Sequence, residues 1–84
     1  MGEYERVYKI IAELKKEKKE IVSEIERLKE TLEELENIPG EERLYEDILA
    51  KIDGLYERLW ETNVEIGECE GYIRELEYID GEDY

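Results

Sequence analysis

The apolar residues of the first 36 positions recur at intervals that alternate between three and four residues. Such intervals fill the a and d positions of a heptad repeat, the pattern of a helix with a coiled-coil seam. Lys18 is the one charged residue in this seam. The pattern predicts a helix over about residues 3–37, with a seam formed by Tyr4, Val7, Ile11, Leu14, Lys18, Ile21, Ile25, Leu28, Leu32 and Leu35.

The second half of the chain repeats this pattern after a short interruption. The segment NIPGEE breaks the heptads, since Pro39 disfavours helix at the preceding residue and Gly40 suits a turn. We expect a turn at about 38–40, a second helix over about 41–78 and a frayed acidic tail at 79–84. The second seam consists of Tyr45, Ile48, Ile52, Leu55, Leu59, Thr62, Ile66, Cys69, Ile73 and Leu76.

A turn this short makes the two helices antiparallel. The two seams then fit in one register, in which the residue numbers of each facing pair add to 80. This register also brings Lys15 within reach of Glu70, and Glu24 within reach of Arg58. Residues 1–84 are therefore predicted to form a single all-α domain, an antiparallel two-helix coiled-coil hairpin about 50 Å long.

The two polar seam residues, Lys18 and Thr62, fall in the same layer of this register. A polar residue at an a position fixes register and association state at some cost in stability. The stem of Lys18 can lie along the seam while its ammonium reaches Glu17 or Glu65. We interpret Lys18 and Thr62 as a register-setting core pair, in preference to a buried charge tuned for chemistry.

Charge is distributed unequally between the two halves. The chain of 84 residues has a formal net charge of −14, of which residues 1–36 carry −3 and residues 37–84 carry −11. This balance argues against direct binding to nucleic acid or to anionic lipid, and it favours a basic protein partner. A strip of carboxylates runs along the second helix with spacings of three or four residues, close to the spacing of phosphates in a nucleic-acid strand, and consists of Glu57, Glu61, Glu65 and Glu68.

The second helix also carries small and apolar residues on its outer side, opposite the seam. Trp60, Val64, Gly67, Gly71 and Tyr78 follow one another at intervals of three, four or seven residues. Trp and Tyr are favoured interface anchors, and small residues let another backbone approach closely. We predict that this line binds a partner, with a rim of carboxylates formed by Glu57, Glu61, Glu68 and Glu75.

A second candidate surface lies on one flank of the seam. Tyr8, Val22, Leu49 and Tyr56 occupy e positions and widen the apolar stripe, as in helices of four-helix bundles. Two hairpins packed through this flank would form a homodimeric four-helix bundle and leave the line around Trp60 free. Which of the two surfaces forms the dimer is left open.

The residues that enzymes and metal sites require are scarce. The chain has no histidine and a single cysteine, and it contains no phosphate-binding or dinucleotide-binding glycine motif. We interpret Cys69 as a small core residue. We expect no catalytic residue, no metal and no cofactor. Since no long apolar run or signal-peptide pattern is present, we expect a cytoplasmic protein without a membrane segment.

The sequence thus favours a non-enzymatic, protein-binding hairpin. The sharper hypothesis is an acidic mimic of nucleic acid that inhibits a basic nucleic-acid-binding protein, as small phage- or plasmid-encoded proteins do. The alternative is a structural or chaperone-like coiled coil, since the hairpin resembles the helical arms of prefoldins in architecture only, without their strands. A designed origin is a further alternative, although Gly54, Gly67 and Gly71 are residues that a designer avoids inside helices.

Overall fold

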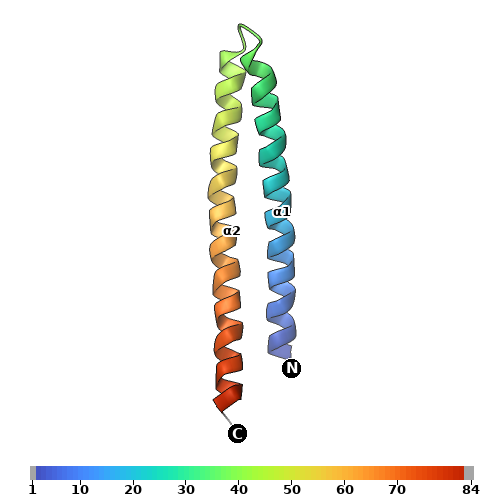
Figure 1. Ribbon diagram of the computed structural model, residues 1–84, viewed down its shortest axis with the longest axis vertical. Coiled ribbons are helices and arrows are strands. Elements are labelled where there is room, and N and C mark those ends of the chain that lie inside the picture. Colours follow the sequence, from blue (N-terminus) through green and yellow to red (C-terminus); the bar gives the residue numbers. More distant parts are fainter. Residues whose placement is uncertain (1, 83–84) are drawn as a thin grey trace.

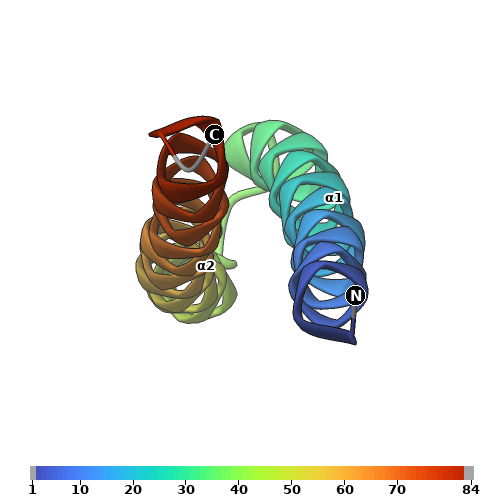
Figure 2. The same ribbon diagram turned by 90° about the horizontal axis from the view of Figure 1, so that it is seen from below.

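The computed structural model describes the backbone of residues 2–82 and the side chains of residues 2–77. It contains two helices, α1 (Gly2–Glu36) and α2 (Glu42–Glu82), which lie side by side and antiparallel (Figure 1). The molecule is a rod with principal extents of 69 × 15 × 14 Å. Figure 2 shows that the helices incline in opposite directions about the rod axis, as two helices of a coiled coil do. The predicted all-α hairpin is confirmed.

The turn has the chemistry that its sequence predicts. The amides of Asn37 and Ile38 bond to carbonyls three residues earlier, so the last turn of α1 tightens before the chain leaves the helix. Pro39 follows, and Gly40 takes a positive φ of 91°, which glycine adopts without steric cost. The carbonyl of Glu41 then accepts the first amide hydrogen bond of α2, from Tyr45 at 3.0 Å.

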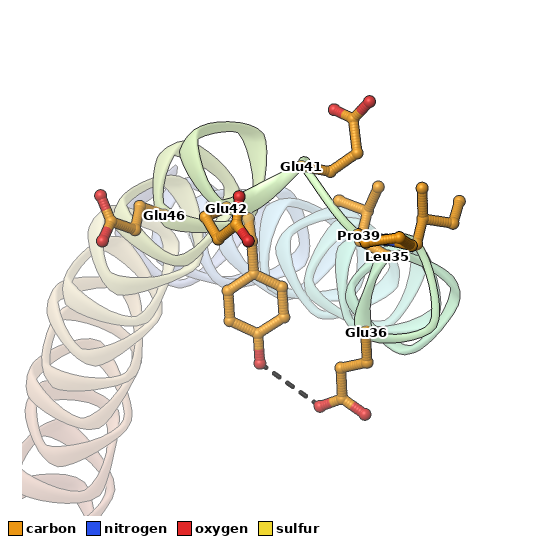
Figure 3. Close-up of a pocket in the computed structure, with 8 residues that line it drawn as sticks. Leu35, Glu36, Pro39, Glu41, Glu42 and Glu46 are labelled. Atoms are coloured by element: carbon orange, nitrogen blue, oxygen red, sulfur yellow. Dashed lines mark hydrogen bonds between the residues drawn. The ribbon is translucent and has the colours of Figure 1, made fainter.

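A hydrogen bond closes the turn from the side. The hydroxyl of Tyr45 donates to the Glu36 carboxylate at 3.3 Å, and so links the last turn of α1 to the first turn of α2 (Figure 3). Both groups are exposed, so this bond contributes at most about 1 kcal/mol. The turn therefore depends mainly on the backbone preferences of Pro39 and Gly40.

The core is the layer where the two seams meet. Among residues 2–77, nine apolar side chains are buried, and all of them occupy predicted seam positions: Ile11, Ile21, Ile25, Leu32, Ile48, Ile52, Leu55, Ile66 and Ile73. Six of these form one contiguous cluster in the half of the rod nearer the turn. Even so, none of the described side chains is less than 2% exposed. Two helices alone enclose only a thin core, because each seam residue keeps one edge open to water.

Contacts across the seam confirm the register. On one flank, Lys15 pairs with Glu70 at 3.8 Å, and the Lys29 ammonium lies 5.4 Å from the centre of the Tyr56 ring. The residue numbers of both pairs add to 85. On the opposite flank, the numbers of Glu17–Arg58 and Glu3–Tyr72 add to 75. These values lie symmetrically about the predicted 80, as the e and g positions on either side of an antiparallel seam require.

One predicted ion pair is wrong. Arg58 bonds to Glu17 at 3.1 Å and not to Glu24. Glu17 lies directly opposite Arg58 on this flank, whereas Glu24 is two turns farther along α1. The pair is exposed, with 59% and 44% of the two side chains accessible, so its contribution to stability is small.

The rod also extends beyond the predicted hairpin. α2 continues to Glu82, so residues 79–82 are helical and the expected frayed tail begins too early. Gly81 continues the helix because a glycine ends a helix only where it takes the left-handed conformation. With 41 residues, α2 is about 60 Å long, which accounts for much of the difference from the predicted 50 Å. Figure 1 shows its end projecting past the start of α1. Residues 83 and 84 lie outside the described part.

The thin core predicts that two apolar residues one turn apart on α2 contribute very differently to stability. Ile48 is 7% exposed and belongs to the core cluster, whereas Leu44, one turn earlier, is 45% exposed. We expect Ile48→Ala to lower the free energy of unfolding by about 2–4 kcal/mol through lost burial and a cavity. Leu44→Ala, the matched control, should change it by less than about 0.5 kcal/mol. Urea unfolding followed by circular dichroism at one protein concentration measures both, and equal losses would contradict the proposed core.

Candidate functional site

The structure joins the two candidate surfaces that the sequence kept apart. Tyr56, from the predicted dimer flank, and Trp60, from the predicted partner line, border the same shallow hollow of about 460 Å³ together with Glu57 and Glu61. The two aromatic residues are four positions apart on α2, and that spacing places them on neighbouring positions of the helix surface. Trp60 is 68% exposed and Tyr56 is 42% exposed. We call the joined surface, made of Tyr8, Val22, Leu49, Tyr56 and Trp60, the aromatic face.

Cations from α1 lie along the aromatic face. The Lys29 ammonium lies over the Tyr56 ring at 5.4 Å, within the range of a cation–π interaction. Hydrogen bonding to Tyr56 raises the pKa of this ammonium above its ordinary value. Lys15, paired with Glu70, lies on the same flank. The face is therefore apolar at its centre and is bordered by lysines on the α1 side.

The same flank has a second hollow nearer the open end of the hairpin. It measures about 420 Å³ and lies between the two helices, where it is lined by Tyr8, Ile11, Lys15, Glu70, Ile73 and Arg74. Tyr8 is 53% exposed and Leu49 is 42% exposed, whereas Val22 is half-buried. The predicted flank residues thus lie where the sequence placed them, along most of the rod.

Three glycines of α2, at 54, 67 and 71, have no packing role within the hairpin. A Cβ atom added at Gly54, Gly67 or Gly71 would have no neighbouring atom within 4 Å, and none of the three has a positive φ. Each therefore lowers helix stability by about 1 kcal/mol relative to alanine without a benefit inside one chain. Gly67 is exposed and Gly71 is half-buried, while Val64 beside them is 38% exposed. Together they leave a flat strip next to Trp60.

The carboxylate strip lies on the other side of the outer face of α2. Glu57, Glu61, Glu65 and Glu68 are all exposed, as is Glu75. Among the described residues, the two ion pairs are Lys15–Glu70 and Glu17–Arg58, so neither uses a carboxylate of the strip. The strip spans about 16 Å along the helix. The side chain of Tyr78, predicted to continue the partner line, lies outside the described residues.

The two residues of the layer formed by Lys18 and Thr62 differ in burial. Thr62 is buried, at 6% exposed, whereas Lys18 is exposed. A lysine stem is long enough to carry its ammonium out of the seam into water, which avoids the cost of burying a charge. The two residues therefore do not form a buried pair. Whether the layer sets the register remains a prediction.

The opposite flank contains exposed apolar residues that belong to neither predicted surface. Tyr72 is 41% exposed, and its hydroxyl donates to the Glu3 carboxylate at 3.1 Å, near the open end of the hairpin. Ile10, at 41% exposed, and Leu44 occupy the same kind of position. Their g positions in the heptad were the available signal. These apolar residues lie near the ends of the rod, separated by charged ones, so this flank offers no continuous apolar surface.

Several carboxylates also gather at the turn. A hollow of about 320 Å³ is lined there by Leu35, Glu36, Ile38, Pro39, Glu41, Glu42, Tyr45 and Glu46 (Figure 3). The labelled carboxylates point in different directions in Figure 3. Within the described part of the chain, no group of three or more histidine, cysteine or acidic side chains could hold a metal ion. Cys69 is half-buried at its seam position.

Comparison with protein families, with curated proteins and with solved structures gives no match to this chain. Neither helix, over its described residues, has a segment that is both long and apolar enough to cross a membrane. The function must therefore be argued from the surfaces themselves.

The bond between Tyr72 and Glu3 predicts a measurable titration. The hydrogen bond to the carboxylate, together with its negative charge, raises the pKa of Tyr72 above the ordinary 10.0. A raised tyrosine pKa means that the bond contributes fully below pH 10 and is lost as the pH rises through the higher folded value. We expect Glu3→Gln to lower the pKa of Tyr72 in a titration followed by NMR of its labelled ring. Glu5→Gln is the control, and a similar shift in both variants would contradict the assigned bond.

Proposed function

We propose that this chain is a non-enzymatic, protein-binding helical hairpin of the cytoplasm that uses the carboxylate strip of α2 to bind a basic protein. The observation that carries the proposal is the exposed and unpaired state of Glu57, Glu61, Glu65 and Glu68 within the described part of the structure. Carboxylates already paired with lysines would offer a partner little electrostatic gain.

The geometry favours a partner whose own ligand is a nucleic acid. A straight helix holds charges in a row at fixed spacing, as a nucleic-acid strand holds its phosphates. A basic groove that binds a strand can accept such a row. The hairpin would then act as an inhibitor or decoy, because it would occupy the groove without being processed.

We propose further that the hairpin forms a homodimer, a four-helix bundle. Two helices leave every core side chain slightly exposed, and large apolar side chains remain on the aromatic face. Exposed apolar patches of this kind mark association surfaces in soluble proteins. Packing a second hairpin on this face would widen the core while leaving Glu61, Glu65 and Glu68 of the carboxylate strip accessible.

Capture from a cell lysate tests the binding proposal, provided that a control variant has the same net charge as the strip variant. The immobilised hairpin should retain nucleic-acid-binding proteins that duplex DNA competes away, and capture should fall steeply between about 50 and 200 mM salt, as counterion release requires. Changing the four strip glutamates to glutamine should abolish capture. The control changes four exposed glutamates of α1 to glutamine instead, at Glu13, Glu20, Glu26 and Glu30. Equal loss in both variants would show a response to net charge only and would contradict the proposed site.

Sedimentation equilibrium tests the dimer independently. We expect the weight-average mass to rise from 10.1 kDa toward twice that value as the protein concentration increases. A mass that stays at 10.1 kDa at every concentration up to the millimolar range would contradict the homodimer. That result would leave the binding of a basic protein untouched.

A further inference from the structure

We propose that the aromatic face binds a second copy of this chain with the two turns at the same end, so that α1 of each copy lies on α2 of the other. The inference rests on the homodimer proposed above and specifies its surface and its arrangement. It assigns Trp60, Gly67, Gly71 and Glu57 at the edge of the carboxylate strip to this self-interface, and it leaves Glu61, Glu65 and Glu68 to the basic partner.

Symmetry allows two ways to stack two hairpins through this face. A two-fold axis along the rod keeps every residue at its height and places α1 over α2 of the second copy. A two-fold axis across the rod reverses the second copy and places α2 over α2, and α1 over α1. The two arrangements bury the same face but bring together different helices.

Charge distinguishes the two arrangements. Residues 37–84 carry −11 and residues 1–36 carry only −3, so stacking α2 on α2 sets the two most acidic helices against each other. Stacking α1 on α2 separates them and places lysines of α1 on the acidic helix. Lys19 then lies within one residue of the height of Trp60 in the second copy, within reach of Glu57. Lys29 lies within two residues of the height of Asp53. Opposite charges so placed favour this arrangement over the other.

Shape supports the same arrangement. Facing residues of the hairpin have numbers that add to 80, as the contacts on both flanks show. At equal height, Val22 therefore lies between Tyr56 and Trp60 of the second copy, and Ala12 lies within one residue of Gly67. Tyr8, which is 53% exposed, lies within one residue of the height of Gly71. Apolar side chains of α1 thus fall on aromatic or flat parts of α2.

This arrangement gives the glycines a physical role. The space around Gly67 and Gly71 is open within one chain, and in the dimer Ala12 and Tyr8 of the second copy would fill it. A side chain larger than that of alanine at either position would hold the helices apart. Glycines that weaken an isolated helix would then be retained because they permit close approach of another chain.

Disulfide trapping distinguishes the arrangements. In a Cys69→Ser background, chains carrying Ala12→Cys are mixed with chains carrying Gly67→Cys and are oxidised mildly. We expect a covalent dimer from this mixture and little from either variant alone. The comparison mixture combines Asp53→Cys with Gly67→Cys, which meet only when α2 lies over α2. Cross-linking of the comparison mixture alone would overturn the inference, even if sedimentation shows a dimer.

Charge reversal tests the lysine contact without cross-linking. Lys19→Glu should weaken the dimer about threefold to tenfold, and adding Glu57→Lys to the same chain should restore it. Lys51→Glu, on the opposite flank of α2, makes the same change in net charge away from the proposed interface. It should weaken the dimer less than Lys19→Glu does. Equal weakening by both reversals, or failure of the second substitution to restore binding, would overturn the arrangement.

The single tryptophan reports burial directly. Trp60 is 68% exposed in one hairpin, so its fluorescence should shift to shorter wavelength as the protein concentration rises through the dimerisation range. Trp60→Ala should weaken the dimer at least about 30-fold, as interface anchors do, while circular dichroism shows unchanged helicity. Tyr72→Ala is the matched control and should leave the dimer intact. A dimer whose Trp60 emission does not change with concentration would overturn the proposed surface.

Discussion

The interlocking of two unbroken heptad seams is the interaction on which the rest of this protein depends. A helix of about 35 residues in water gains little from its own hydrogen bonds, so most of its stability must come from burying one face. Here that face is a single row of residues on each helix, and the only surface that covers it is the other row. Every apolar residue that is buried in the described part of the chain belongs to a seam, so the helices have no second source of burial over those residues.

This dependence explains the shape of the molecule and its exposed surface. A two-helix rod with extents of 69 × 15 × 14 Å has a large surface for its volume, and no described side chain reaches complete burial. Apolar residues on the flanks therefore remain in water, and they are not distributed equally. On one flank, Tyr56 and Trp60 meet near the middle of the rod, whereas the apolar residues of the other flank lie near its ends. The proposed dimer follows from this asymmetry.

Charge acts on the same geometry at longer range. A rod spreads a net charge of −14 over a greater length than a compact domain would, which lowers self-repulsion. The uneven distribution gives one helix lysines along the aromatic face and gives the other an exposed row of carboxylates. Ion pairs between the helices are few and exposed, so they adjust the register more than they stabilise the fold.

The sequence by itself determined the hairpin, its turn and its register, because a period of 3.5 residues and a proline–glycine turn are local signals whose physical meaning does not depend on the rest of the chain. It also placed Tyr8, Trp60 and the carboxylate strip on exposed positions. The spacing of four between Tyr56 and Trp60 was enough to show that the two candidate surfaces join, and the separate heptad labels concealed it.

The tertiary structure decided what depends on side-chain reach and on the covering of one helix by the other. It directed Arg58 to Glu17, left Lys18 exposed in a layer in which Thr62 is buried, and extended α2 to Glu82. It also showed that the space around Gly67 and Gly71 is empty within one chain. The periodicity of the sequence indicates the helix face on which a residue lies. Only the two packed helices show which faces remain uncovered.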